Sequence, residues 1–294
     1  MKPSVRGSGC LLEVTLMRPN IRFVYADLKN MVCIGVVLSF AAVGGAGLAH
    51  ADMSVPAKAL EVPGIKGDDN RVRVKIADYP WRMIGRLNRN GSHCTGILVG
   101  PSTILTAAHC FWDKRRKQWS VPSAFHFVLG YEKGEVKAHS KIERFELPDG
   151  LPPTQTTKKP TVENDWAIAK LEKPLGEQFG FASAADFNLL GLRDILSSGA
   201  VVIQAGYSRD IAHMLTADED CEISDIRQSK SGRLLLHQCD ATQGDSGSPL
   251  FLYDGTSYDL IGIHVATISS PNGRSEGIAV STEMFGKRIS QQPK

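Results

Sequence analysis

The sequence predicts an all-β fold, and three observations lead to this prediction. Short runs rich in Val, Ile, Phe and Thr recur along the chain, and turn-forming residues separate them. The composition, with 42% hydrophobic and 22% charged residues among 294, is that of an ordinary globular protein rather than a disordered or fibrous one. No internal repeat of short period is evident. Short strands separated by turns are typical of a β-barrel or a β-sandwich, and the length suffices for one large domain or two small ones.

The predicted strands follow one another along most of the chain. They are Arg71–Ile76, Trp81–Leu87, Thr95–Val99, Thr103–Thr106, Phe125–Leu129, Trp166–Leu171, Ala200–Ala205, Leu234–Leu236, Pro249–Tyr253, Leu260–Val265 and Gly277–Val280. Two helices are expected besides them. A short one falls within Ser183–Ile195, in the link between two halves of the strand pattern. A last helix runs through Ile289, and we expect Thr282 to cap it because its hydroxyl can accept a first-turn amide hydrogen.

An apolar segment without charged side chains lies near the start of the sequence. Residues 30–51 contain no Asp, Glu, Lys or Arg, basic residues precede them, and 31–48 form an apolar core. Ala49 and Ala51 are the small residues that a signal peptidase requires, so we expect cleavage after Ala51 and export to the periplasm or the medium. A retained membrane anchor is the alternative, although the second half of the segment is rich in Gly and weakly apolar.

The cysteine pattern agrees with export. Four cysteines follow Ala51, namely Cys94, Cys110, Cys221 and Cys239. An even number predicts two disulfide bonds in an oxidising compartment, and four cysteines allow three pairings. No Cys-x-x-Cys pair is present among them, which disfavours a zinc site.

The excess positive charge is concentrated at the N-terminal end. Residues 1–51 carry five basic and two acidic side chains, which equals the net charge of +3 of the whole sequence. The neutral remainder disfavours a general electrostatic role on nucleic acid or on an anionic membrane. The short basic run Lys114–Lys117 is interpreted as a solvated loop.

The strongest chemical motif is Gly244–Pro249, which reads Gly-Asp-Ser-Gly-Ser-Pro. The hydroxyl of Ser246 becomes a good nucleophile only when a base removes its proton. The glycines around it let backbone amides approach a reacting carbonyl group. A simple Gly/Ser/Pro turn is the alternative interpretation of six residues taken alone.

Two further residues supply the partners that such a serine needs. His109 ends an apolar run, and an imidazole can take up and return a proton near neutral pH. Asp165 stands at the head of a predicted strand, where a buried carboxylate can orient that imidazole. Each of these residues alone would more often be structural, so only the combination indicates catalysis.

In the order His109, Asp165, Ser246, these residues resemble the catalytic triad of the chymotrypsin-like (trypsin-like) serine protease family. The resemblance extends from Ile65 to Ile289. Its further segments are Tyr79–Trp81 with Ile84–Gly85, Cys94–Val99, Ala107–Cys110, Ala205–Tyr207 and Ile261–His264. It implies two six-stranded antiparallel β-barrels with the active site in the cleft between them and a short C-terminal helix. The protease domain then covers 65–294, with its barrels at about 71–175 and 198–282.

The resemblance also implies a chemical role for each residue. Ser246 is the nucleophile, His109 the general base and then the general acid, and Asp165 the orienting carboxylate. The backbone N–H groups of Gly244 and Ser246 form the oxyanion hole, which binds the negative oxygen of the tetrahedral intermediate. The family pattern needs neither a metal nor an organic cofactor.

The implied function is that of an exported serine endopeptidase that hydrolyses peptide bonds through an acyl-enzyme intermediate. The expected partner is a polypeptide substrate, and no nucleic acid is expected. Membrane contact is expected only if the apolar segment is retained. The enzyme is expected to be a monomer. The family pattern pairs Cys94 with Cys110, and we expect Cys221 to pair with Cys239. The alternatives are a catalytically silent homologue that acts as a binding module and a membrane-anchored form of the protease.

Several details resemble the bacterial glutamyl-endopeptidase-like branch of the family, among them Ser248 and His264. Preference for P1, the substrate residue before the scissile bond, stays open. Asp240, six residues before Ser246, stands where trypsins bind Arg or Lys, whereas His264 stands where the glutamyl branch binds an acidic side chain. Thr242 is the third candidate for the substrate pocket. A basic, an acidic and a small or apolar preference all remain, and a structural carboxylate is the alternative for Asp240.

Activation forms a separate hypothesis. Asp245 resembles the residue that pairs with a newly freed amino terminus in proteases made as zymogens, where this ion pair orders the oxyanion hole after cleavage. The usual Ile-Val-Gly-Gly start is absent from the sequence. We therefore hypothesise that a short propeptide within residues 52–64 is removed.

Overall fold

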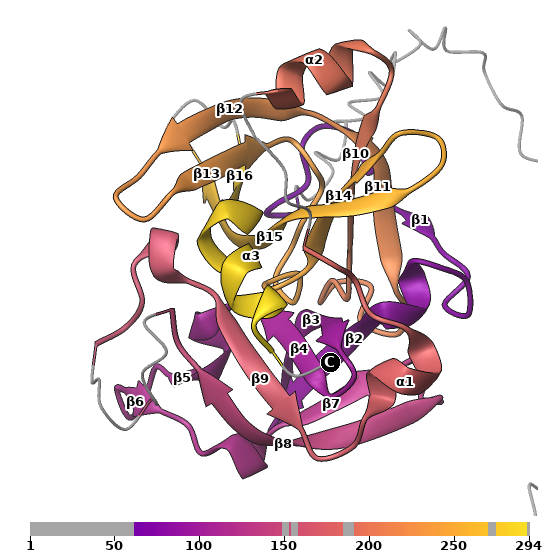
Figure 1. The fold of residues 1–294 in the computed structure, drawn as a ribbon. Helices are drawn as coiled ribbons and strands as arrows, with labels where there is room; N and C mark the ends of the chain where they lie inside the picture. Colours follow the sequence, from indigo (N-terminus) through magenta and orange to yellow (C-terminus); the bar gives the residue numbers. More distant parts are fainter. Residues whose placement is uncertain (1–61, 149–152, 154–157, 185–190, 270–274, 293–294) are drawn as a thin grey trace, which may run out of the picture. The chain divides into compact units, whose positions relative to one another are not determined.

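The computed structural model describes residues 62–148, 153, 158–184, 191–269 and 275–292, and all of these belong to one compact unit. The predicted N-terminal extension with its apolar core, the cleavage after Ala51 and most of the hypothesised propeptide lie outside the described residues. Within the described part, no helix combines the length and the apolar character needed to cross a membrane. β-Strands dominate the fold, which confirms the predicted class (Figure 1).

Six strands of the first half close into an antiparallel barrel in the order β2-β3-β4-β9-β8-β7. They are β2 (Ile84–Arg89), β3 (Ser92–Gly100), β4 (Thr103–Thr106), β7 (His126–Leu129), β8 (Ala138–Glu146) and β9 (Ala167–Leu171). The sequence pattern does not predict β8, because only Ser140, Ile142 and Phe145 of its nine residues are buried and charged residues alternate with them. The closed barrel leaves no free strand edge and provides a rigid support for the loops at its rim.

Short elements connect these strands. They are η1 (Trp81–Met83), η2 (Ala108–Phe111), β5 (Trp112–Asp113), β6 (Gln118–Trp119), η3 (Pro122–Ala124), η5 (Val162–Asn164) and α1 (Leu175–Phe179). The predicted strand Trp81–Leu87 therefore begins as a 3-10 turn, and pairing with β3 starts at Ile84. Trp81 and Met83 are buried in this turn, so their apolar character reflects packing rather than strand pairing.

The second half contains one eight-stranded sheet in the order β1-β11-β10-β14-β15-β16-β13-β12. Its strands are β1 (Val72–Arg73), β10 (Val201–Gly206), β11 (Thr216–Cys221), β12 (Ile223–Gln228), β13 (Arg233–His237), β14 (Pro249–Tyr253), β15 (Tyr258–Ser269) and β16 (Ser275–Ser281). Every neighbouring pair is antiparallel. The sheet has eight strands rather than the expected six, in part because the incoming chain adds β1 to the edge of β11.

Two helices flank the second half. A short helix is expected within Ser183–Ile195, and α2 (Leu192–Ser197) overlaps only the end of that range and extends two residues beyond it. The expected last helix is α3 (Thr282–Ser290). The predicted cap of α3 is wrong. Ser281 occupies the N-cap position, no side chain caps the helix, and the Thr282 hydroxyl has no hydrogen-bond partner among the described residues. Buried Phe285 and Ile289 hold α3 in place instead.

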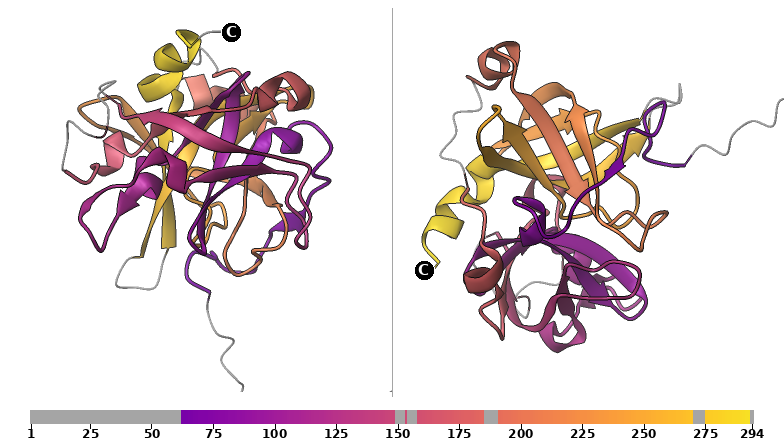
Figure 2. Two further views of the ribbon diagram at one scale, coloured as in Figure 1. Left: turned by 90° about the horizontal axis from the view of Figure 1, so that it is seen from below. Right: turned by 90° about the vertical axis from the view of Figure 1, so that its right-hand side faces the viewer.

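The two halves meet along β3 and the loop between β13 and β14. Figure 2 shows the first barrel, in purple, beside the orange and yellow strands of the second half. The Thr95 amide of β3 donates a hydrogen bond to the Ser246 carbonyl at 2.9 Å, and one apolar cluster continues through both halves. From Thr95 to Gly100 β3 is buried throughout, since both of its faces are covered. This contact brings the serine loop to the rim of the first barrel.

Candidate active site

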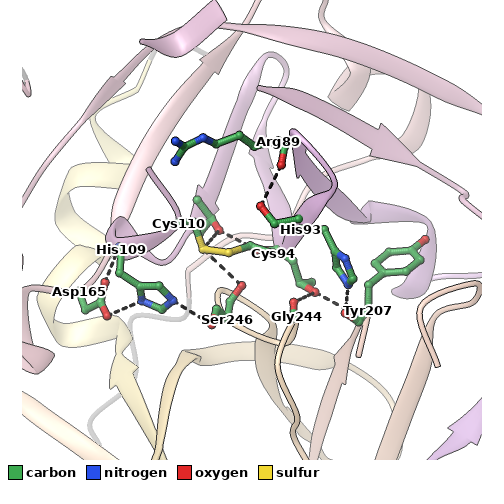
Figure 3. The surroundings of a disulfide bond; sticks show 12 residues. Arg89, His93, Cys94, His109, Cys110, Asp165, Tyr207, Gly244 and Ser246 are labelled. Atoms are coloured by element: carbon green, nitrogen blue, oxygen red, sulfur yellow. Dashed lines mark hydrogen bonds and ion pairs between the residues drawn. A yellow bond between two sulfur atoms is a disulfide. The ribbon is translucent and has the colours of Figure 1, made fainter. Parts of the chain in front are cut away.

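Three side chains from three separate loops meet where the two halves face each other (Figure 3). His109 belongs to η2, which follows β4. Asp165 lies between η5 and β9, and Ser246 lies in the loop from β13 to β14. His109 Nδ1 is 2.7 Å from Asp165 Oδ2, and His109 Nε2 is 2.9 Å from Ser246 Oγ. The structure thus places the three predicted catalytic residues in one continuous chain of hydrogen bonds.

Valence assigns the hydrogen-bond roles in this chain. A carboxylate can only accept, so His109 Nδ1 carries a hydrogen and donates it to Asp165. In a neutral imidazole Nε2 is then an acceptor, and it receives the hydroxyl hydrogen of Ser246. The other oxygen of Asp165 accepts the backbone N–H of His109 at 2.7 Å. The buried carboxylate of Asp165 therefore holds both the ring and the backbone of His109, and Nε2 of the ring faces Ser246.

A disulfide bond supports this side of the site. Cys94 of β3 and Cys110 of η2 are joined at 2.07 Å directly beside His109 (Figure 3). A second disulfide bond joins Cys221, at the end of β11, to Cys239 after β13. The ligand atoms of Cys94, His109 and Cys110 lie within 4.8 Å of one another, but the two sulfurs are bonded together and are not free thiolates.

Two backbone amides beside the serine are left without a partner. Among the described residues, nothing accepts a hydrogen bond from the N–H of Gly244 or of Ser246. The amides of Asp245, Gly247 and Ser248, in contrast, all donate within the protein. Unpaired backbone donors are rare in folded proteins. Two of them next to a serine hydroxyl that is bonded to an imidazole can receive a negatively charged oxygen.

Gly244 occupies a position that no other residue fits. Its φ is +104°, in the left-handed region that favours glycine. A Cβ there would lie 2.4 Å from the Tyr207 carbonyl oxygen and 2.6 Å from His93 Nε2. The segment after β10 and the side chain of His93 therefore pack directly on the backbone of Gly244 (Figure 3).

Asp240 is one of the three residues predicted to line the substrate pocket, and its carboxylate is occupied by the backbone. It is only 1% exposed. The Lys66 amide donates to its Oδ1 at 2.7 Å, and the Asn70 amide donates to its Oδ2 at 3.0 Å. Both donors belong to the incoming chain, so this carboxylate fastens residues 64–70 to the loop that carries the serine.

Thr242 is also held within the protein. Its hydroxyl donates to Asp210 Oδ1 at 2.6 Å, and its amide donates to Asp245 Oδ2 at 2.7 Å. Asp210 in turn accepts two hydrogen bonds from Arg71 of the incoming chain. Thr242 therefore belongs to the network that supports the serine loop.

His264, the third predicted pocket residue, lies on β15 beside the loop that carries Ser246. Its carbonyl accepts the amide of Gly247 at 2.7 Å. Its Nδ1 is 3.0 Å from His237 Nε2, and His237 Nδ1 accepts the amide of Cys239 at 3.2 Å. His237 therefore carries its hydrogen on Nε2 and donates to His264, whose own hydrogen is on Nε2. Burial, together with the charge of Lys66, lowers the pKa of His264 to about 3, so the ring is a neutral donor.

Asp245 has internal partners in place of an amino terminus. Its carboxylate is 1% exposed and accepts hydrogen bonds from the Ser208 hydroxyl and the Thr242 amide, both at 2.7 Å. Burial raises the pKa of Asp245 to about 6, although the Ser208 hydroxyl acts in the opposite direction. Among the described residues, no ammonium or guanidinium group forms an ion pair with Asp245.

Sequence reasoning missed the residues that support the site from behind. Lys66 and His237 act on the predicted pocket residues, and Thr95 and Ser208 act on the serine loop. Of these four, Thr95 lies within the family segment Cys94–Val99, and Ser208 directly follows the segment Ala205–Tyr207. Each of them acts across a long sequence separation, so no local pattern marks them.

The fold and the site define a serine protease of the chymotrypsin-like class. A family model described as Trypsin matches residues 70–289, and the chain belongs to this family of peptide hydrolases. A glutamyl endopeptidase from Bacillus licheniformis is 26% identical over 247 residues, which cover 80% of this chain and 71% of that protein. A suppressor of tumorigenicity 14 protein homolog from Bos taurus is 26% identical over 197 residues, which cover 59% of this chain and 22% of that protein.

Solved structures show the same fold. A Glu endopeptidase in complex with MPD is similar with a TM-score of 0.60 at 21% identity, covering 77% of this chain and all of that one. A thermostable serine protease from an extremophilic microorganism has a TM-score of 0.52 at 19% identity, covering 72% of this chain and 98% of that one. The family model and the glutamyl endopeptidase relative confirm the resemblance to the chymotrypsin-like family that the sequence predicts.

Proposed function

We propose that this protein is an active serine endopeptidase with Ser246 as its nucleophile. The observation that carries the proposal is the hydrogen-bonded chain Asp165–His109–Ser246, with contacts of 2.7 and 2.9 Å, next to two unpaired amides. A hydroxyl bonded to a basic nitrogen is activated for attack. No catalytic position of the family pattern is occupied by an inert residue, which argues against a silent homologue.

The geometry supports acyl transfer in two steps. Ser246 Oγ attacks the peptide carbonyl while His109 Nε2 takes its proton, and the amides of Gly244 and Ser246 receive the negative oxygen. The C–N bond then breaks, and His109 returns the proton to the leaving amine. Water hydrolyses the resulting ester at Ser246, with His109 again as base. Asp165 keeps the ring in the required tautomer and stabilises its protonated form.

We further propose that substrates with a hydrogen-bond acceptor at P1, glutamate before others, are preferred. Backbone amides of the incoming chain occupy both oxygens of Asp240, so this side chain has no free acceptor for a basic P1 residue. His264 offers a neutral N–H, with only a 3.5 Å contact between Nε2 and the Thr267 hydroxyl. The positive charge of Lys66 acts on the same ring. These features favour an acidic side chain over a basic one, and the first relative described above is named a glutamyl endopeptidase.

Export is part of the proposal. The predicted signal segment 31–48 and two disulfide bonds both fit an oxidising compartment outside the cytoplasm. The Ala241 amide donates to the Gly64 carbonyl at 3.1 Å, and Lys66 and Asn70 bind Asp240. A mature chain that begins at or before Gly64 therefore keeps these contacts, in agreement with propeptide removal within residues 52–64.

Matched peptide substrates that differ only at P1 test both parts of the proposal. We expect the purified secreted protein to hydrolyse the Glu substrate fastest and the Lys substrate slowest. Ser246→Ala should reduce kcat on the order of 10⁶-fold, because the nucleophile is lost. A folded wild-type protein that hydrolyses none of the peptides would indicate a silent homologue, and faster cleavage after Lys than after Glu would refute the P1 assignment.

Asp240→Asn separates the two interpretations of Asp240. If Asp240 is structural, the variant loses stability by about 1–3 kcal/mol, because the NH2 group of Asn cannot accept a hydrogen bond and leaves one of the two backbone amides unpaired. The ratio of Glu to Lys cleavage then stays the same. A large change in that ratio without loss of stability would place Asp240 in contact with the substrate.

A further inference from the structure

The loop of the oxyanion hole lies against one short segment that follows β10. Three successive residues of this segment each hold one residue of the loop or of the strand behind it. The Arg209 amide donates to the Gln243 carbonyl at 2.6 Å. The Ser208 hydroxyl donates to Asp245, and the Tyr207 amide donates to the hydroxyl of Thr95. Gln243 and Asp245 belong to the loop that carries Ser246, whereas Thr95 belongs to β3 of the first barrel.

Thr95 contacts both residues whose amides are unpaired. Its hydroxyl accepts the Tyr207 amide at 2.9 Å and donates to the Gly244 carbonyl at 2.9 Å. Its own amide donates to the Ser246 carbonyl at 2.9 Å. Thr95 is fully buried, and its carbonyl accepts the Thr106 hydroxyl at 2.7 Å. One side chain and one amide therefore bind the carbonyls of both predicted oxyanion-hole residues.

Glycine makes this external support necessary. The peptide C=O and N–H point in opposite directions, so fixing the Gln243 carbonyl through Arg209 also fixes the direction of the Gly244 N–H. Gly244 itself imposes little restriction on rotation of the next peptide. The Thr95 hydroxyl holds that second peptide through its carbonyl. With both peptide planes held, the backbone of Gly244 has one conformation.

The described structure achieves this order without an amino terminus at Asp245. Oδ2 of Asp245 accepts hydrogen bonds from Ser208 and Thr242 instead. Lys66 and Asn70 of the incoming chain bind Asp240 rather than Asp245. The support of the oxyanion hole is therefore built from side chains that are present before any cleavage.

We propose that Thr95 is a positioning residue for the oxyanion hole, which its hydroxyl keeps in the binding conformation independently of a freed amino terminus. The proposal deepens the proposed function, since it concerns the same acyl-transfer site. Thr95 does not touch the reacting atoms, and its effect passes through Gly244. Loss of the hydroxyl should therefore weaken binding of the transition state more than binding of the substrate.

Thr95→Val tests this inference because it removes the hydroxyl and keeps the shape. We expect kcat to fall about 10- to 100-fold, less than for loss of an oxyanion-hole donor itself, with KM changed less than about twofold. The inhibition constant of a peptidyl trifluoromethyl ketone, which forms a negative oxygen on attack by serine, should rise in parallel with the loss in kcat/KM. Thr95→Ser restores the hydroxyl and should retain kcat within about threefold.

Thr103→Val is the matched control. Thr103 is a buried threonine of the same barrel, and its hydroxyl has no hydrogen-bond partner among the described residues. This variant should keep wild-type kcat and inhibitor affinity. If Thr95→Val does not fold, Thr95→Cys retains a weak donor and should have a kcat below that of Thr95→Ser.

The outcomes separate this inference from the proposed function. A Thr95→Val enzyme with unchanged kcat and inhibitor affinity, beside an active wild type, overturns the role of Thr95 alone. Equal losses in Thr95→Val and Thr95→Ser also overturn it, because packing would then be responsible. A folded wild-type protein without activity overturns both the inference and the proposed function.

Discussion

The two sides of Ser246 are built in different ways. On one side, the proposed catalytic groups are the side chains of His109 and Asp165, in a chain of contacts of 2.7 and 2.9 Å that ends at Ser246. On the other side, the proposed oxyanion-hole groups are backbone amides, and the side chains that hold their loop lie behind it. For His109 and Asp165, the residue type itself specifies the chemistry. For the residues behind the amides, the residue type matters only because it fixes a backbone conformation, and any side chain that forms the same hydrogen bond can fix that conformation.

Among variants that keep Ser246, the largest loss of activity is expected from a change on the side of His109 and Asp165. Asp165→Asn keeps the shape but removes the charge that sets the tautomer of His109. We expect kcat to fall about 10⁴-fold, because an amide that donates toward Nδ1 favours the wrong tautomer. Hydrolysis of the best peptide substrate measures this effect. A loss of less than about tenfold would mean that Asp165 does not orient the ring.

The next largest loss of activity is expected from a change on the side of the backbone amides. Gly244→Ala places a Cβ 2.4 Å from the Tyr207 carbonyl oxygen, so the loop has to move and at least one free amide turns away. We expect kcat, measured on the same peptide, to fall about 10²- to 10³-fold, the usual cost of losing one oxyanion-hole donor.

Gly134→Ala is the control for Gly244→Ala. Gly134 has a similar φ of +94°, but a Cβ at this position would have nothing within 4 Å of it. The variant should therefore show the cost of the backbone conformation, about 1 kcal/mol of stability, without loss of kcat. Equal kcat values for the two alanine variants would show that the close contact at Gly244 is not needed.

The smallest expected effect concerns Asp245, behind the serine loop, and is a pH dependence of the free energy of unfolding. The pKa of Asp245 is about 6 in the folded protein against 3.8 for an ordinary aspartate, so the folded state favours the protonated form. Stability from this group is complete below pH 3.8 and is lost as pH rises through 6. The loss amounts to about 3 kcal/mol. Asp245→Asn does not titrate, so its stability relative to wild type should increase by about this amount over the same range.

Denaturant unfolding of both proteins at several pH values measures this difference. The comparison between variants is required because the lowered pKa of His264 changes stability in the opposite direction in both proteins. A difference that does not vary with pH would show that burial does not raise the pKa of the Asp245 carboxyl group.

The same contrast explains how much the sequence predicts. His109, Asp165 and Ser246 stand in short motifs whose residue types carry the chemistry, so their assembly follows from the family pattern. Thr95 looks like an ordinary strand residue, and its partners Tyr207 and Gly244 are 112 and 149 residues away. A hydrogen bond across such a separation leaves no periodic signal.

Strand prediction shows a similar limit. The strand β4 is predicted correctly because all four of its residues are buried and the sequence there is accordingly a run of Thr, Ile and Leu. β11 contains Asp218, Glu219 and Asp220, and β12 is mostly exposed or half-buried, so neither has the expected apolar pattern. Their strand conformation comes from pairing with β10 and β13.

The position of Asp240, six residues before Ser246, suggests a contact with the substrate. In the structure, amides of the incoming chain occupy its carboxylate instead.

Covalent labelling of the purified secreted protein with a fluorophosphonate, followed by peptide mass mapping, tests the central claim most directly. The label reacts only with a serine that has both an activating base and an oxyanion hole. We predict stoichiometric label on Ser246, abolished by prior denaturation and by Ser246→Ala, in a chain whose first residue lies at or before Gly64. A folded protein of that length without label on Ser246 would contradict an assembled active site.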